Sequence, residues 1–439
     1  MRGRQNNGEK KVAVMKKRFV SFMIIGAMTA ALAAGCGATG GGKDTASSDS
    51  GAQSYTGPVE EVSLTVMTPA EDDQWIRQES AAFEKAHPEY KVTWNYLQTS
   101  ESDAKDVILK DPKAVAQCGD VYMFANDQLT SLVKANAILK LGGAASDAVR
   151  ADNGEAMVAS VTYQDSIYAV PYTSNTWFMF YDKSVFSESD VKSLDTMLTK
   201  GRVAMNITDG WYFPAFYAGN GCTFYGNGTD ESAKIDFSGD KAANVTKALA
   251  ALVSNKNFVV ATPEDSVGML LAEDPSKKIS AFMGGSWNTQ AVMERLGENM
   301  GCAALPTFKV DGKDVQMKAF TGSKALGVNP NAVNQKAAVE LAAFLGSEEA
   351  QMDHFKLRQM PPINKTVSSS ADVQKNPACS AQAAVAANTS ILQPTFGMES
   401  WWDAATNFAK AIISGEVNEA NAAEKTAAFN ETINSVTSR

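Results

Sequence analysis

A change in hydrophobic periodicity near residue 60 constrains the fold of this chain more than any other feature. Apolar residues alternate with polar ones over 62–66, which is the spacing of a strand with one buried face. Over 75–86 they recur at helical spacing, and Pro88 disfavours helix at His87 and beyond. Alternation then returns over 92–96. Strand, helix and strand in this order predict a βαβ unit with two parallel strands.

Strands and helices continue to alternate along the chain. A helical stretch over 103–109 precedes a strand predicted at 120–124, and the next helix is expected to end near 138–141, before Gly142 and Gly143. Further strands are predicted at 167–170, 177–181, 279–283 and 325–328. Further helices are predicted at 240–254, 335–345, 348–354 and 402–413. This pattern indicates α/β architecture.

Residues 1–35 have the order of an export signal peptide. Basic residues lie between Lys10 and Arg18, an apolar run covers 19–32, and small residues follow up to Cys36. The apolar run is shorter than the ~20 residues that a transmembrane helix needs. Met15 is an alternative start, and the sequence does not decide between the two.

The cysteine that follows the small residues resembles a bacterial lipobox, although Ala33 stands where that motif usually has leucine. The resemblance implies cleavage before Cys36 and a diacylglycerol on its sulfur. An ordinary secretory signal with a chance cysteine is the alternative. Residues 36–57 are predicted to be the lipidated cysteine and a flexible tether, because Gly, Ser, Ala, Thr and Asp cannot bury enough surface to fold.

The charge balance excludes nucleic acid as a partner. The whole chain has a net charge of −9, and residues 1–35 hold seven Lys or Arg against one Glu, so the mature chain is close to −15. Such a chain lacks the clustered cations that phosphates demand and is repelled by anionic membranes, so the lipid must provide the anchoring. The 404 residues after the signal peptide suit two domains.

The sequence contains no metal, redox or nucleophile motif that would indicate catalysis. The four cysteines after Cys36 are widely spaced, and whether they form disulfides stays open: Cys118, Cys222, Cys302 and Cys379. His87 and His354 lack metal-ligand spacing and are expected at the surface or at helix ends. The segment around Ser286 nearly matches a nucleophile elbow, but Asn288 replaces its last glycine. We therefore predict no catalytic residue, no metal and no cofactor.

Six segments together resemble a known family. In order they are 82–85 with 91–93, 119–127 with 137–139, 167–172 with 180–183, 281–287 with 304–308, 336–350, and Trp401 with Trp402. Over nearly the whole mature chain they are similar to the maltose-binding-protein family of ABC-importer proteins. The resemblance implies an α/β, two-lobed periplasmic-binding-protein type II fold with a hinge and an interlobe cleft.

The family fold implies lobe boundaries in this chain. Lobe one is expected at 58–173 with 324–372, and lobe two at 174–320 with 377–437. The hinge is then expected near 171–175, near 320–324 and at Asn376. A ligand that contacts both lobes favours the closed state over the open one.

The resemblance also implies a function. The chain is expected to bind a carbohydrate, maltose or a maltooligosaccharide, as the substrate-binding lipoprotein of an ABC importer. It would be a monomer that meets the importer's membrane subunits on the outer face of the cytoplasmic membrane. A surface hydrolase acting on glycans is the enzyme alternative, because sequence cannot exclude that two carboxylates meet in space. A ligand sensor of the same fold is the other alternative.

Sugar hydroxyls need fixed hydrogen-bond partners, and sugar C–H faces need flat apolar surfaces. The resemblance implies six ligand contacts at positions that match those of the family. They are Phe124 and Asp127 after the third strand, Asp209 and Trp211 further on, and the two tryptophans Trp287 and Trp402. Gln128 and Asn175 stand where charged residues are expected. Asp72, Asp73 and Asn175 are predicted to be solvated surface.

Overall fold

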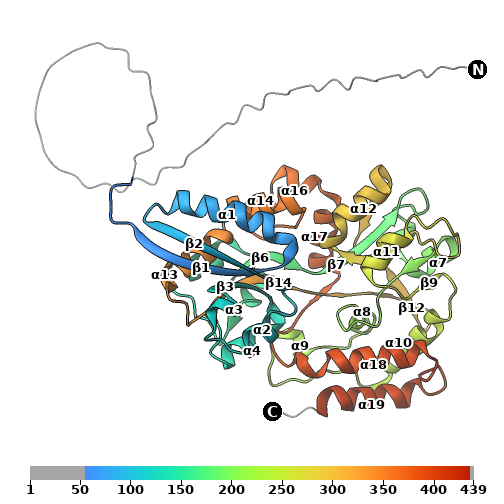
Figure 1. Ribbon diagram of the computed structural model, residues 1–439. Coiled ribbons are helices and arrows are strands. Elements are labelled where there is room, and N and C mark those ends of the chain that lie inside the picture. Colours follow the sequence, from blue (N-terminus) through green and yellow to red (C-terminus); the bar gives the residue numbers. More distant parts are fainter. Residues whose placement is uncertain (1–54, 436–439) are drawn as a thin grey trace, which may run out of the picture. The chain divides into compact units, whose positions relative to one another are not determined.

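The structure, a computed structural model, describes residues 55–435. The predicted signal peptide, Cys36 and the tether up to residue 54 lie outside these residues. The described part folds around two separate sheets (Figure 1). None of its helices has both the length and the apolar character needed to cross a membrane.

The first sheet contains the predicted βαβ unit. Its strands are β1 (Glu60–Thr68), β2 (Tyr90–Gln98), β3 (Val121–Ala125), β6 (Ala169–Asn175), β14 (Ala319–Val328) and β15 (Ser390–Leu392). β1 pairs in parallel with both β2 and β3, whereas β14 is antiparallel to β3. The order is β15-β14-β3-β1-β2, with β6 paired to β14 off this path. The parallel pair predicted from the change in periodicity is therefore confirmed.

Helices cover this first sheet. They are α1 (Asp73–Ala86), α2 (Ala104–Ile108), α3 (Val115–Cys118), α4 (Leu129–Lys134), α5 (Gly143–Asp152), α6 (Glu155–Ala159), α13 (Gln335–Leu345) and α14 (Glu348–Arg358). The short α15 (Lys365–Ser368) and α16 (Ala371–Lys375) follow α14. β4 (Thr162–Tyr163) and β5 (Ser166–Ile167) form a small hairpin beside them.

The prediction that the helix after β3 continues to residues 138–141 is wrong. α4 ends at Lys134, and Asn136 takes a left-handed backbone conformation with φ 51°. The chain beyond it lies against the sheet: the Leu139 N–H donates to the carbonyl of Val328 at 2.8 Å. Gly142 does not stop a helix but precedes α5 as its N-cap.

The second sheet has the order β11-β7-β10-β8-β9. Its strands are β7 (Trp177–Asp182), β8 (Val203–Ala204), β9 (Phe258–Val259), β10 (Ala281–Gly285) and β11 (Met300–Ala303). A hairpin of β12 (Thr307–Val310) and β13 (Lys313–Gln316) lies outside it. The helices of this part are α7 (Leu194–Lys200), α8 (Pro214–Gly219), α9 (Tyr225–Gly228), α10 (Gly239–Val253), α11 (Pro263–Met269), α12 (Thr289–Leu296), α17 (Pro377–Asn388), α18 (Trp402–Ile413) and α19 (Ala422–Ser435).

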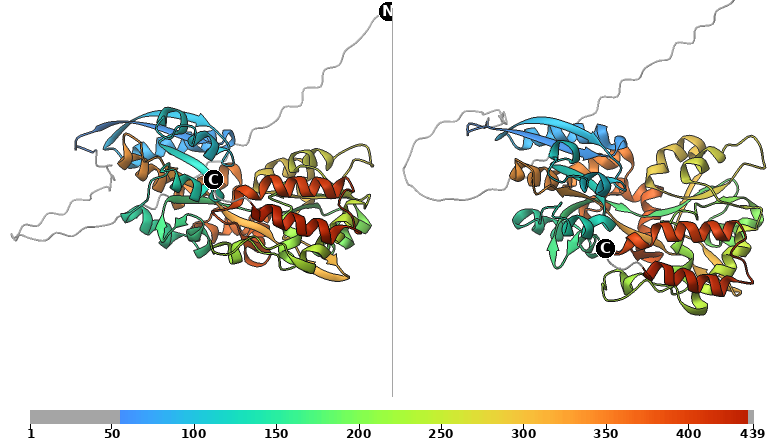
Figure 2. Two further views of the ribbon diagram at one scale, coloured as in Figure 1. Left: turned by 90° about the horizontal axis from the view of Figure 1, so that it is seen from below. Right: turned by 60° about the horizontal axis from the view of Figure 1, so that its bottom comes forward.

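Each sheet has its own hydrophobic core. The first core collects buried residues from Val62 to Tyr172 and again from Ala325 to Ala350, and the second collects them from Trp177 to Phe320 and from Ala378 to Ile433. We call these parts the first and the second lobe. Figure 2 shows the same division from two other sides, with blue β1 and β2 at one end and red α18 and α19 at the other. The residue boundaries and hinge positions given above remain a prediction.

Two long strands run from one core to the other. β6 ends at Asn175, one residue before β7 of the second lobe, and β14 passes from Phe320 in the second core to Ala325 in the first. β6 and β14 pair antiparallel, but the register is irregular next to Lys324: Lys324 lies opposite Thr173, and Ala325 lies opposite Pro171. An irregularity of this kind bends a strand and redirects its side chains.

Two predictions about exposure are wrong. Asp72 is 4% exposed rather than solvated, and its carboxylate accepts hydrogen bonds from His354 Nε2 at 3.1 Å and Arg358 Nε at 3.0 Å. Burial raises the pKa of Asp72, but His354 and Arg358 outweigh burial and bring the pKa below its ordinary value. His354 is buried against Trp75, with ring centroids 4.2 Å apart. His87, in contrast, follows α1 as its C-cap.

The four described cysteines are free thiols. Cys118, Cys222 and Cys379 are buried and Cys302 is half-buried. Burial raises the pKa of Cys222, Cys302 and Cys379 to about 12, so these thiols are poor nucleophiles at neutral pH.

Candidate functional site

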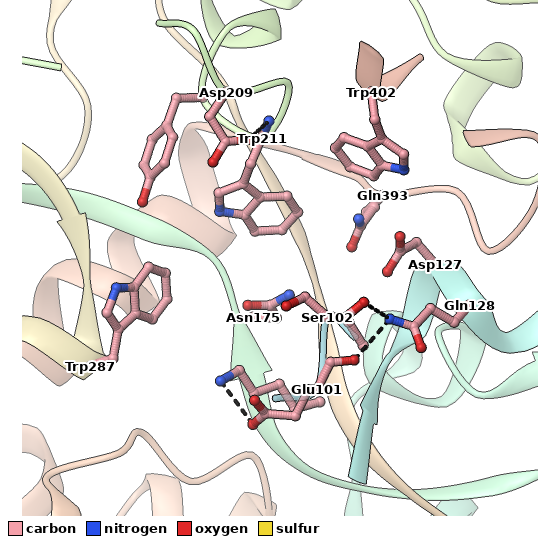
Figure 3. Close-up of a pocket in the computed structure, with 13 residues that line it drawn as sticks. Glu101, Ser102, Asp127, Gln128, Asn175, Asp209, Trp211, Trp287, Gln393 and Trp402 are labelled. Carbon is pink, nitrogen blue, oxygen red and sulfur yellow. Dashed lines mark hydrogen bonds and ion pairs between the residues drawn. The ribbon is translucent and has the colours of Figure 1, made fainter. Parts of the chain in front are cut away.

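A cavity of about 520 Å³ opens between the two lobes (Figure 3). Its lining residues are Glu101, Ser102, Ala125, Asp127, Gln128, Asn175, Asp209, Trp211, Tyr212, Trp287, Lys324, Gln393 and Trp402. Three indoles, three carboxylates and several amides therefore share one space.

The turn after β3 positions the first carboxylate. Asn126–Gln128 forms one 3-10 turn, and Asn126 fixes it: its Oδ1 accepts the Ser323 N–H at 3.1 Å. Gln128 is tied to the loop after β2, because its Nε2 donates to the carbonyls of Glu101 and Ser102, both at 2.8 Å. With both flanking side chains held, Asp127 between them faces the cavity (Figure 3).

Asp127 has an unusual acidity. Burial raises its pKa to about 7; its own backbone N–H and the charge of Lys105 act in the opposite direction. The charge of Glu399 adds to the increase. At neutral pH this side chain therefore exists both as a carboxylate, which only accepts hydrogen bonds, and as an acid, which also donates one.

The turn after β10 has the same construction in the second lobe. Ser286–Asn288 forms a 3-10 turn, and Asn288 Oδ1 accepts the Gly285 N–H at 3.2 Å. Trp287 between them lines the cavity. A Cβ atom on Gly285 would clash with the six-membered ring of Trp287, so only glycine lets the indole lie over this strand end.

A second loop of the same lobe adds an indole and a carboxylate. Asp209 Oδ1 accepts the backbone N–H of Trp211 at 2.8 Å, which closes a local turn. The carbonyl of Trp211 accepts the indole N–H of buried Trp177 at 3.3 Å. The ring of Trp211 packs against Phe320, with ring centroids 5.7 Å apart. Burial raises the pKa of Asp209, opposed by its bond to the Trp211 N–H.

Two adjacent tryptophans have different roles at the start of α18. Trp401 is fully buried, and its Nε1 donates to the carbonyl of Gly210 at 2.9 Å. This bond ties α18 to the loop that carries Asp209 and Trp211. Trp402, one residue on, is only partly buried against the same core and lines the cavity.

A charged group lies where the connecting strands β6 and β14 meet the cavity. Lys324 Nζ is 2.9 Å from Glu101 Oε1, and the Tyr172 hydroxyl donates to the same oxygen at 3.0 Å. Lys324 Nζ also lies 5.8 Å from the ring centroid of Trp287. One carboxylate of the first lobe therefore holds Tyr172 of β6 and Lys324 of β14, and Lys324 also reaches the indole of Trp287 in the second lobe.

Comparison with known proteins gives the family. Residues 80–381 match the bacterial extracellular solute-binding protein family. The chain belongs to this family. A galactooligosaccharide-binding protein of Bacillus subtilis (strain 168) is 23% identical over 434 residues, which cover 94% of this chain and 96% of that protein.

Solved structures agree on the two-lobed fold. A protein solved with acarbose is 53% identical, with a TM-score of 0.81, over 86% of this chain and 99% of that one. A maltodextrin-binding protein from L. casei BL23, solved without ligand, is 28% identical, with a TM-score of 0.77, over 85% and 99% of the two chains. The prediction of the maltose-binding type of α/β fold is confirmed.

Phe124 does not belong to the cavity of this solute-binding protein. Every residue of β3 is buried, and Phe124 is 0% exposed and packs edge-on against Tyr122 at 5.9 Å. Because β3 is an inner strand of a sheet covered by helices, its side chains belong to the core. The other five side chains predicted to contact the ligand line the cavity: Asp127, Asp209, Trp211, Trp287 and Trp402.

Sequence reasoning missed several lining residues. Asn175 was predicted to be solvated surface, but it lines the cavity at the end of β6. Glu101 and Ser102 follow the carboxyl end of β2, and that position in a parallel sheet was an available signal. Lys324 lies inside a strand, where no sequence pattern distinguishes a cavity residue from a surface one.

The cavity suits binding more than catalysis. Its flat indoles can stack on C–H surfaces, and its carboxylates, amides and ammonium can satisfy hydroxyl groups from both donor and acceptor sides. Among the described residues that line it there is no histidine or cysteine. The lining thus lacks the residues that most often activate a nucleophile.

Proposed function

We propose that this solute-binding protein captures a maltooligosaccharide, maltose or a longer chain, between its two lobes. The observation that carries the proposal is the combination of Trp211, Trp287 and Trp402 with carboxylate and amide groups around one cavity. Glucose rings present C–H faces and equatorial hydroxyls, so each ring needs an apolar plane and polar partners at its edge.

The relatives support this class of ligand. One similar structure was solved with acarbose, and another is a maltodextrin-binding protein. The galactooligosaccharide-binding relative supplies a second candidate, an oligosaccharide of galactose. Both candidates are chains of sugar rings, which suits three indoles better than one monosaccharide does.

The two-lobed construction supports a role in import. The cavity is lined by turns of both lobes and by β6 and β14, which connect them. A ligand that bridges both walls stabilises the closed state, and the membrane subunits of an ABC importer can then recognise closure. The protein would act as a monomer and hand its sugar to those subunits.

The proposal includes export and lipid anchoring through Cys36. The signal-peptide pattern of residues 1–35 and the acidic mature chain support it. Replacement of Cys36 by Ser should leave uncleaved precursor or release the protein into the medium. Normal lipid labelling of the Cys36→Ser protein would show that the anchor lies elsewhere.

A sugar panel tests the binding function. Titration with maltose, maltotriose, maltotetraose, cellotriose and a galactotriose, followed by tryptophan fluorescence and calorimetry, should give saturable binding of the maltose series. Binding that is confined to the galactotriose would favour the second candidate. If no oligosaccharide binds, the proposed function is wrong.

The same samples separate the alternatives. The sugars should be recovered intact after long incubation. Steady release of shorter sugars, proportional to protein and lost on mutation of Asp127 or Asp209, would favour the hydrolase. Deletion of the importer's membrane subunits should abolish sugar uptake that depends on this protein, whereas a sensor would leave uptake intact and alter only the response to the sugar.

A further inference from the structure

A cluster of metal-ligating side chains lies outside the cavity lining, at the end of α1 in the first lobe. His87, Glu89 and Glu340 each offer one ligand atom, and these atoms all lie within 4.8 Å of one another. None of the three lines the cavity. Their side chains are 24%, 32% and 31% exposed, so solvent reaches the cluster.

Aromatic neighbours hold two of the three side chains, His87 and Glu340, in place. The ring of His87 stacks on Phe83 with centroids 4.3 Å apart and lies edge-on to Phe344 at 6.4 Å. The hydroxyl of Tyr90 donates to Glu340 Oε2 at 2.6 Å and orients that carboxylate. Ligands fixed by packing and by an outer hydrogen bond lose little freedom when a metal ion binds.

The geometry fits a small transition-metal ion. His87 Nδ1 and Glu89 Oε1 are 3.1 Å apart. Two ligands on a tetrahedral ion, each bound at roughly 2.0–2.2 Å, lie about 3.3 Å from one another. All three ligand atoms lie within 4.8 Å of one another, so a change of the Glu340 rotamer can bring its carboxylate to the ion.

We propose that His87, Glu89 and Glu340 form a binding site for a divalent transition-metal ion, with Zn²⁺ as the preferred ion. Imidazole nitrogen and carboxylate oxygen are both ligands that zinc takes, and water can complete the coordination on the exposed side. A nitrogen ligand disfavours Mg²⁺ and Ca²⁺, which take oxygen. The ion would join the end of α1 and the start of β2 to the middle of α13.

Lys336 shows what the ion must displace. Its Nζ lies 3.5 Å from Glu340 Oε1 and 3.1 Å from the Tyr90 hydroxyl, and its side chain is 74% exposed. An exposed ion pair of this kind contributes little stability, so the lysine can turn into solvent when the metal binds. Removal of the Lys336 charge should therefore strengthen metal binding.

The experiment is a titration of the purified protein with ZnCl₂, and separately with CoCl₂, followed by calorimetry and thermal unfolding. One equivalent should bind and raise the unfolding temperature. His87→Gln and Glu340→Gln should each weaken binding at least tenfold, as loss of one of three ligands requires, whereas Lys336→Ala should strengthen it several-fold. The matched control is Glu348→Gln, which removes an exposed carboxylate from neighbouring α14 and should change nothing.

Two control measurements distinguish loss of the metal site from unfolding of the variant and from metal binding by cysteine. The metal-free unfolding temperature of each variant shows that it is folded, and Glu340→Gln tests the site if His87→Gln destabilises the end of α1. The Co²⁺ complex should lack the strong absorption of cobalt thiolates, since the proposed ligands are nitrogen and oxygen. Retention of full binding in both variants, a thiolate band, or no saturable binding would each overturn the proposal.

Discussion

Two turns, one in each lobe, share a backbone design and differ in the side chain that they present. In the first lobe Asn126–Gln128 follows buried β3, and in the second Ser286–Asn288 follows buried β10. Both are 3-10 turns fixed by an asparagine side chain. The middle residue is Asp127 in one and Trp287 in the other, and both line the cavity.

This difference shows that the two lobes contribute different chemical groups to the cavity. The first lobe presents polar groups, including Glu101, Asp127 and Gln128, whereas all three indoles of the cavity come from the second lobe. The second lobe therefore supplies every stacking plane and also Asp209, whereas the first lobe supplies polar groups without an aromatic plane. A sugar that uses both must contact both lobes, which links binding to closure.

The largest expected effect separates aromatic residues of the core from aromatic residues of the cavity. Phe124→Ala and Trp401→Ala should each lower the free energy of unfolding by about 3–5 kcal/mol, because both rings are fully buried. Chemical denaturation of the unliganded protein measures this loss. If the Phe124 variant keeps its stability but loses sugar affinity, Phe124 contacts the ligand and the first lobe also supplies a stacking plane.

The next effect is on sugar affinity. Trp287→Ala and Trp402→Ala should each weaken binding of the preferred oligosaccharide at least tenfold, since a buried aromatic face contributes about 0.5–1.5 kcal/mol beyond its area and 1.4 kcal/mol is one decade. Both rings are only half-buried in the unliganded protein, so its unfolding temperature should change little. A variant that unfolds early yet binds as before would place that indole in the core.

A smaller effect tests whether Lys324 of β14 holds the carboxylate of Glu101 in place. Lys324→Met should cost about 1–3 kcal/mol of unfolding free energy, because it leaves the buried Glu101 carboxylate with Tyr172 as its remaining side-chain partner. The double variant Glu101→Gln with Lys324→Met should recover much of this loss, because no unpaired charge remains. Additive losses in this double-mutant cycle would mean that the pair is not coupled.

A further expected effect is a pH dependence that only the first of the two turns can have. The pKa of Asp127 is raised to about 7 by burial, whereas an unfolded aspartate titrates near 3.9. The folded state thus binds the extra proton between these pH values, and stability should fall as the pH rises from about 4 to about 7.

Asp127→Asn should remove its share of that slope. Glu79, whose pKa is also raised to about 7 by burial, should supply another share, so Glu79→Gln is the matched comparison. Chemical denaturation at several pH values measures both shares. Trp287→Phe, at the equivalent turn position, should leave the slope unchanged, and an unchanged slope in Asp127→Asn would refute the assignment.

The order and type of the main elements were determined by sequence alone. Alternation over 62–66 and 92–96 and helical spacing over 75–86 required β1, α1 and β2, because periodicity reports which faces are buried. The end of α4 was not determined, because Lys134 and Leu141 carry no local signal as clear as Pro88. The backbone bonds of Leu139 to β14 and of Leu141 to β5 decided it, and these partners are distant in sequence.

The candidate site shows the same limit. The resemblance to a known family selected Asp127, Asp209, Trp211, Trp287 and Trp402, and these residues line the cavity. Tertiary structure alone decided that Phe124 is core and that Lys324 meets Glu101. Each of these depends on packing between segments remote along the chain, which local sequence patterns do not encode.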